Sequence, residues 1–118
     1  MVENKVRNKI LLVQSPPWGS YAPPLGIAYL VSFLKSHGFR SEIYDLNMDI
    51  FLNSPKEMKE KWDTQDFEFW ASGEAVERLK DKIEHLADNI LSYNADIIGF
   101  SATFASAPFL NKLLSILR

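Results

Sequence analysis

The segment from Lys9 to Phe39 constrains the fold more than any other part of the chain. It opens with an uninterrupted apolar run, Ile10–Val13, which is typical of a parallel strand covered on both faces. A loop over Gln14–Ala22 then leads to Pro23 and Pro24, which favour a helix start. Apolar residues recur after the prolines at helical spacing, at Ile27, Leu30, Val31 and Leu34. Gly38 suits the left-handed end of this helix, so the segment predicts a strand, a long loop and a helix.

The same alternation continues along the chain. Ser41–Leu46 and Asp96–Ser101 are predicted to be the second and third strands. A second helix is predicted from Glu74 to Tyr93, and a third begins near Pro108. The apolar stripe of the second helix consists of Val76, Leu79, Ile83, Leu86 and Ile90. Strands that alternate with helices indicate an α/β fold with a parallel sheet between helices.

We expect the doubly wound, flavodoxin-like (Rossmann-like) strand order 2-1-3, with two further strands in the complete domain. The chain ends at Arg118 within a helical pattern, which suggests truncation after the third strand and helix. Ligands of such sheets bind at the carboxyl ends of strands one and three, where the order reverses. The predicted site therefore combines the loops 14–22 and 101–106.

Composition bounds the function. The chain has 118 residues, 47% hydrophobic and 24% charged, as expected for one domain. Its net charge of -2 and lack of a basic run argue against nucleic-acid binding. No apolar stretch approaches the ~20 residues of a membrane span, and no cleavable leader is visible, so a cytoplasmic location is expected. The absence of cysteine excludes disulfides and iron–sulfur ligation within these residues.

The first loop is a poor phosphate site. It lacks the Gly-x-Gly-x-x-Gly pattern, because only Gly19 and Gly26 are present, and no Gly-x-x-x-x-Gly-Lys string occurs. Its prolines remove the N–H groups that cradle a phosphate. Rigid prolines beside Trp18 and Tyr21 favour instead a stiff, partly apolar wall for a large flat ligand.

The strings LLVQSPPWGSYAPPLGIAYLVSFLKSHGF, EIYDLN and ADIIGFSAT together resemble the N-terminal cobalamin-binding-type domain of radical S-adenosylmethionine proteins. This group includes cobalamin-dependent methylases and the magnesium-protoporphyrin ester cyclase. The resemblance implies that residues 1–118 are the N-terminal part of a cobalamin-binding domain. The downstream radical domain, with S-adenosylmethionine and a 4Fe-4S cluster, would be its partner and the catalytic half, so this chain alone would not be an enzyme.

The resemblance also implies a set of site residues. Cobalamin domains with a histidine ligand carry Asp-x-His-x-x-Gly after the first strand, where this chain has Gln14, Ser15, Pro16, Pro17, Trp18 and Gly19. Cobalamin would then be held without a protein histidine, or not held at all. Ser101, Ala102 and Thr103 resemble the Ser-x-Leu that lies against the nucleotide tail. No catalytic residue or metal ligand is assigned, and His37 and His85 receive no role.

Several residues have a purely structural alternative. The prolines also suit a stiffened turn, Ser101 and Thr103 are good helix caps, and Asp45 suits a solvated strand end. The aromatic insertion 47–73 has three interpretations: a lid over the ligand, a docking surface, or a short helix over Pro55–Trp62 packed on the core.

Two functions follow. The first is a cobalamin-binding module of an enzyme that methylates or cyclises an unreactive carbon. The alternative is a non-binding structural or substrate-recognition domain of the same fold. The third strand would have an open edge in either case, which favours self-association there.

Overall fold

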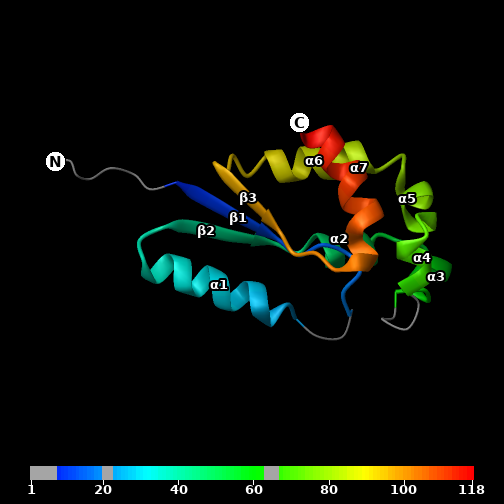
Figure 1. Ribbon diagram of the computed structural model, residues 1–118, viewed down its shortest axis with the longest axis horizontal. Coiled ribbons are helices and arrows are strands. Elements are labelled where there is room, and N and C mark those ends of the chain that lie inside the picture. Colours follow the sequence, from blue (N-terminus) through cyan, green and yellow to red (C-terminus); the bar gives the residue numbers. More distant parts are fainter. Residues whose placement is uncertain (1–7, 20–22, 63–66) are drawn as a thin grey trace.

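The computed structural model describes residues 8–19, 23–62 and 67–118. Its sheet has three parallel strands, β1 (Lys9–Val13), β2 (Arg40–Tyr44) and β3 (Ile97–Phe100), in the order β2-β1-β3 (Figure 1). In the middle of the sheet, Leu12 of β1 is paired with Ile43 on one side and Gly99 on the other. The α/β class, the parallel sheet and the predicted order of the three strands are confirmed.

The second strand ends two residues earlier than predicted. Asp45 is the N-cap of helix α2 (Leu46–Leu52), and its Oδ1 accepts a hydrogen bond from the backbone N–H of Met48 at 3.0 Å. An aspartate that caps a helix satisfies one of the free N–H groups of the first turn. Asp45 is therefore a cap, and its interpretation as a solvated strand end was wrong.

Helix α1 (Leu25–Ser36) covers one face of the sheet. It starts directly after Pro24, and Gly38 follows its end with a φ of 87°, the left-handed conformation that was predicted. Ile27 and Val31 of the predicted stripe are buried against the sheet, whereas Leu30 is half exposed.

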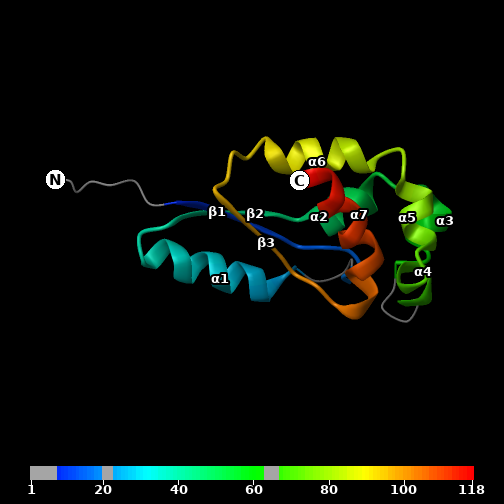
Figure 2. The ribbon, with the colours of Figure 1, turned by 45° about the horizontal axis from the view of Figure 1, so that its top comes forward.

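The other face is covered by α6 (Ile83–Leu91) and α7 (Ala107–Leu117), as Figure 2 shows together with α5 (Glu74–Leu79). The single helix predicted over 74–93 is thus wrong. A short turn breaks it, in which the N–H of Lys82 donates to the carbonyl of Leu79 at 2.8 Å. The break lets the apolar stripe follow two surfaces, because α6 runs along the sheet while α5 turns away to pack against α4 (Phe67–Ala71) and α7.

The aromatic insertion builds the core. Besides α2 and α4, the described part of the insertion contains the short helix α3 (Lys56–Lys59). Trp62 and Trp70 are fully buried, with their ring centroids 4.9 Å apart in an edge-on arrangement, and Phe109 of α7 lies 6.0 Å from Trp70. This packing agrees with the third interpretation of the insertion, although α3 is shorter than the predicted Pro55–Trp62.

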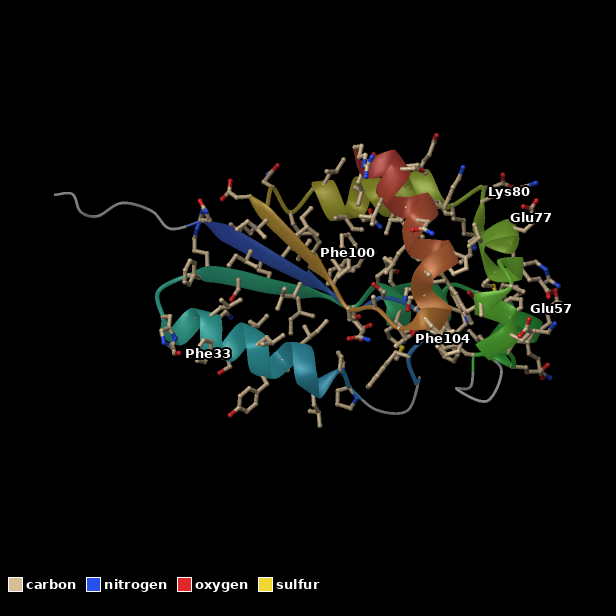
Figure 3. The ribbon with its side chains drawn as sticks, in the orientation of Figure 1. Phe33, Glu57, Glu77, Lys80, Phe100 and Phe104 are labelled. Atoms are coloured by element: carbon tan, nitrogen blue, oxygen red, sulfur yellow. The ribbon has the colours of Figure 1, made fainter. Side chains whose placement is uncertain are left out.

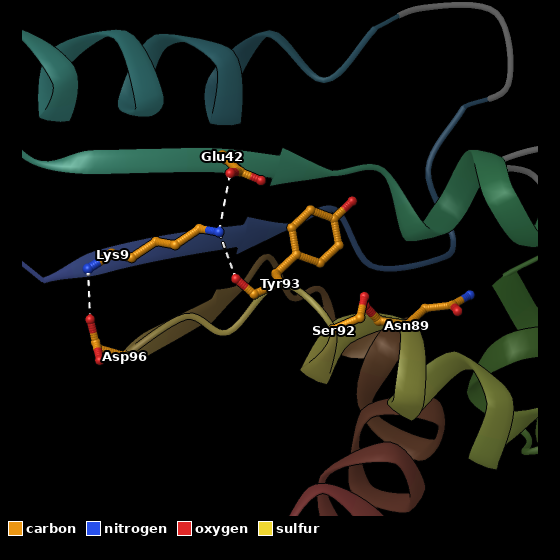
Figure 4. A network of polar contacts seen from close by, with 6 residues as sticks. All are labelled: Lys9, Glu42, Asn89, Ser92, Tyr93 and Asp96. Atoms are coloured by element: carbon orange, nitrogen blue, oxygen red, sulfur yellow. Dashed lines mark hydrogen bonds and ion pairs between the residues drawn. The ribbon is translucent and has the colours of Figure 1, made fainter.

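A polar network fixes the amino ends of the strands (Figure 4). The Nζ of Lys9 donates to the carbonyl of Tyr93 at 2.6 Å and lies 3.2 Å from a carboxylate oxygen of Glu42 on β2. The backbone N–H of Lys9 donates to Asp96, directly before β3, at 2.8 Å. One residue at the start of β1 thereby connects all three strands.

We expect Lys9→Met to lower the free energy of unfolding by about 1.5 kcal/mol, because a charged hydrogen bond to a partly buried carbonyl is lost while the aliphatic stem is kept. Urea unfolding measures this loss. Lys80→Met is the matched control, since Lys80 is exposed and its ion pair with Glu77 lies on the surface. An equal loss in both variants would contradict the role of the network.

Within the ranges described above, no helix is long and apolar enough to cross a membrane.

Candidate functional site

A cavity of about 330 Å³ lies at the carboxyl ends of β1 and β3, the predicted switch point. Its walls come from the loop after β1, the first turns of α1 and the loop after β3. Seven of the nine predicted site residues line it: Gln14, Ser15, Pro17, Trp18, Ser101, Ala102 and Thr103. The structure thus brings together two loops that lie more than eighty residues apart in the sequence.

The other two predicted residues do not line the cavity. Pro16, joined to Pro17 by a cis peptide bond, and Gly19 are both buried beside it. Tyr21, expected to form part of the wall, lies outside the described residues. Sequence reasoning also missed three lining residues, which are Gly26, Ile27 and Leu30, whereas the fourth, Ser106, lies within the predicted loop 101–106.

The two loops are hydrogen-bonded to each other. The backbone N–H of Ser15 donates to the Oγ of Ser101 at 2.9 Å, and the N–H of Ser101 donates to the carbonyl of Val13 at 3.0 Å. Ser101 therefore has a structural role, connecting the two loops, that does not require a ligand. The hydroxyl of Ser15, by contrast, is buried and has no hydrogen-bond partner within the described part of the chain.

Thr103 is the N-cap residue of the short 3-10 helix Phe104–Ser106, which precedes α7. Its backbone N–H donates to the Oγ of Ser106 at 3.3 Å, and the N–H of Ser106 returns a bond to the carbonyl of Thr103 at 3.0 Å. This is the capping role considered from the sequence. Figure 3 shows the course of this segment from Phe100 on β3 to Phe104 beyond the end of the strand.

Asn47, which was not predicted as a site residue, holds the first loop in place. Its backbone N–H donates to the carbonyl of Gln14 at 2.9 Å, and its Oδ1 accepts from the N–H of Trp18 at 2.9 Å and from the Nε1 of Trp62 at 2.8 Å. The side chain is only 1% exposed. Nothing in the sequence distinguishes this asparagine from a surface one, because the partners of its side chain, Trp18 and Trp62, lie 29 and 15 residues away along the chain.

Among the described residues, none that lines the cavity carries a charged side chain. Its polar groups are neutral amides and hydroxyls, and much of the wall is apolar, from Pro17, Trp18, Ile27 and Leu30. A pair of nucleophile and base is also lacking among these residues. The cavity is therefore suited to holding a neutral, largely apolar group and not to acid–base chemistry.

Neither histidine lies at this cavity. His37 follows α1, with its Nδ1 3.0 Å from the carbonyl oxygen of Phe33. His85 lines a second cavity of about 380 Å³ between α2 and the α5–α6 turn, near Asp49. Among the described residues there is no group of three or more His, Asp or Glu side chains that could hold a metal ion.

Asp49, which lines the second cavity, accepts a hydrogen bond from the hydroxyl of Tyr44. Burial, followed by this hydrogen bond, raises the pKa of Tyr44 well above its usual value. Asn89 donates to the Tyr44 hydroxyl at 3.4 Å. These contacts satisfy one another and connect α2 and α6 with the end of β2.

Comparison with protein-family models, curated proteins and solved structures finds no match for this chain. Its class therefore rests on its own fold and cavity: an α/β protein with an open parallel sheet and an uncharged cavity at the carboxyl ends of its central strands.

Proposed function

We propose that the chain is the N-terminal part of a flavodoxin-like, cobalamin-binding module, and that its uncharged cavity takes the nucleotide-base tail of cobalamin. The observation that supports this most is the position of the cavity, between the two loops that the resemblance implicates. The whole protein would be a radical S-adenosylmethionine enzyme that methylates or cyclises an unreactive carbon. Its downstream domain would carry S-adenosylmethionine and the 4Fe-4S cluster.

The residues present fit such a tail. A volume of about 330 Å³ is near the lower end of small-molecule sites, enough for a flat bicyclic base but not for the corrin macrocycle. The macrocycle would have to lie outside the cavity. The Ser15 hydroxyl, which has no hydrogen-bond partner among the described residues, offers a buried polar group to the ligand, and Pro17 and Ile27 offer apolar contact.

The cobalt would have no histidine ligand from the described part of this chain, because His37 and His85 lie away from the cavity. Bound cobalamin supplies a cobalt centre for methyl or radical chemistry. The chain's own residues would bind the tail, orient it through the stiff Pro16–Pro17 loop and exclude water from it.

The alternative is a structural or substrate-recognition domain that binds no cofactor. It is favoured by the bond between Ser15 and Ser101, which explains the Ser-x-Thr match without a ligand. In either case we propose that the outer edge of β3 pairs with another strand. Ile97 on this strand is 49% exposed, and β3 pairs only with β1 among the described strands.

The Gly26→Leu variant should bind hydroxocobalamin at least ~10-fold more weakly than the wild type, because even one extra methylene group in a binding pocket costs about 1–3 kcal/mol of binding free energy. Gly26 lines the cavity, and a Cβ at this position would meet no atom within 4 Å. The added side chain therefore enters open space and spares the fold. The measurement is a titration of the 118-residue chain with hydroxocobalamin, followed by visible absorption.

Gly26→Ala is the control, since one methyl group leaves most of the cavity open and should stabilise α1 by about 1 kcal/mol. His37→Ala and His85→Ala should leave the spectrum of the bound cobalamin unchanged. If the wild type binds no cobalamin, the cofactor proposal fails and the structural alternative stands. Equal binding by wild type and Gly26→Leu would mean that the site lies elsewhere.

A further inference from the structure

Helix α1 is apolar around most of its circumference. No charged residue occurs from Leu25 to Leu34, and Lys35 is the first. A helix that is apolar all round is normally buried on every side. Yet α1 contacts the sheet with one face only, where Ile27 and Val31 are buried.

The opposite face carries three large side chains, which we call the α1 stripe: Leu25, Tyr29 and Phe33. They are 71%, 78% and 55% exposed, and Leu30 beside them is 52% exposed. Residues four apart lie on one side of a helix and form a continuous ridge. In Figures 1 and 2 no other helix or strand of the described chain lies on the side of α1 that faces away from the sheet.

The exposed area is large enough to matter. Side chains of this size present roughly 150–250 Å² each, so the stripe and Leu30 together leave about 500 Å² of mostly apolar surface in water. Apolar patches of this extent usually mark an interaction site. Two such patches face to face would bury about 1,000 Å², which is the lower limit for a specific interface and corresponds to a weak, reversible dimer.

We propose that the α1 stripe is the contact surface of a homodimer, in which α1 of one copy packs against α1 of a second copy across a two-fold axis. A two-fold axis sets a patch against itself. Here that brings no like charges together and buries no unpaired charge, because the stripe has none. Ridges of residues four apart also fit the grooves of an identical helix. A charged partner, by contrast, would find no counter-charge on this face. Leu30 also lines the candidate cavity, but Leu25, Tyr29 and Phe33 do not, so the stripe does not depend on a bound ligand.

The test is sedimentation equilibrium of the 118-residue chain from micromolar to millimolar concentration. The wild type should form a dimer, and Tyr29→Glu should raise its dissociation constant at least ~30-fold, the effect of losing a central contact residue. Ala28→Glu is the matched control, because it adds the same charge to the same helix about 100° away from Tyr29. It should leave the dimer intact. Circular dichroism should show equal helix content in all variants, and Leu25→Glu repeats the test at a second position.

Ile97→Lys tests whether the chain associates through the open edge of β3 instead of the α1 stripe, because it places a charge on an exposed residue of β3. The α1 dimer should survive this change. A wild type that stays monomeric at every concentration would overturn the proposal. Association that is abolished by Ile97→Lys but not by Tyr29→Glu would also overturn the proposal, because the contact would then lie at the sheet edge. Oligomers larger than a dimer that form through the α1 stripe would overturn it as well.

Discussion

The Trp70→Ala variant should lose about 4 kcal/mol of unfolding free energy, the largest effect that we expect of any single substitution in this chain. Trp70 is 0% exposed, and the rings of Trp62, Phe69 and Phe109 surround it at centroid distances of 4.9 to 6.0 Å. Its removal leaves a cavity that these rings cannot all fill. Since a domain of this size is stable by only about 5–15 kcal/mol, urea unfolding followed by circular dichroism should show a much lower midpoint.

Two milder substitutions make this prediction specific. The indole N–H of Trp70 has no hydrogen-bond partner in the described part of the chain, whereas that of Trp62 donates to Asn47. Trp70→Phe should therefore cost less than Trp62→Phe by about 1 kcal/mol, the usual value of one hydrogen bond. If Trp70→Ala cost less than the loss of a surface contact, the insertion would not be part of the core, and the lid interpretation would return.

Strands β1 and β3 could be predicted from the sequence because each is one short apolar run, and the strand order follows from the alternation of strands and helices. Covered parallel strands have that pattern whatever their neighbours are. The end of β2 could not be predicted, because an aspartate such as Asp45 is equally suited to a strand end and to a helix cap. Its role is decided by Leu46–Leu52, which forms a helix. Local propensity alone does not settle such boundaries.

The break between α5 and α6 was hidden for a related reason. The apolar stripe from Val76 to Ile90 keeps helical spacing through Lys80–Lys82, so the period predicts one helix. The break depends on what each half covers: α5 packs on α4 and α7, while α6 packs on α7. Tertiary packing, which the period of a single segment does not report, overrides the pattern.

The candidate cavity could be placed in large part because neighbouring parallel strands end at the same edge of a sheet. This geometry brings Gln14–Trp18 and Ser101–Thr103 together without any knowledge of side-chain contacts. The walls supplied by Gly26 and Leu30 depend on the angle at which α1 returns past the sheet. That angle is set by packing of Ile27 and Val31 and has no signature in the loop itself.

Replacing Asn47 by leucine should lower the free energy of unfolding by about 3 kcal/mol, because it leaves the N–H of Trp18 and the Nε1 of Trp62 without their shared acceptor. A buried donor left unpaired costs about 1–3 kcal/mol, and that of Trp62 is the more deeply buried of the two. Urea unfolding measures the loss. Asn89→Leu is the matched control, since the hydrogen bond of the Asn89 side chain to Tyr44 is long, at 3.4 Å, and its loss should cost under about 1 kcal/mol.

The Asn47→Leu variant also distinguishes an effect on the conformation of the loop after β1 from an effect on the stability of the whole fold. Asn47 is a positioning residue of the loop: it connects Gln14 and Trp18, which line the cavity, to Trp62 in the insertion. Under conditions where both variants remain folded, Asn47→Leu should therefore make Trp18 more accessible to an aqueous fluorescence quencher, whereas Trp70→Phe should not. Equal quenching in the two variants would show that the loop keeps its conformation without Asn47, and that Pro16 and Pro17 alone are enough to hold the wall of the cavity in place.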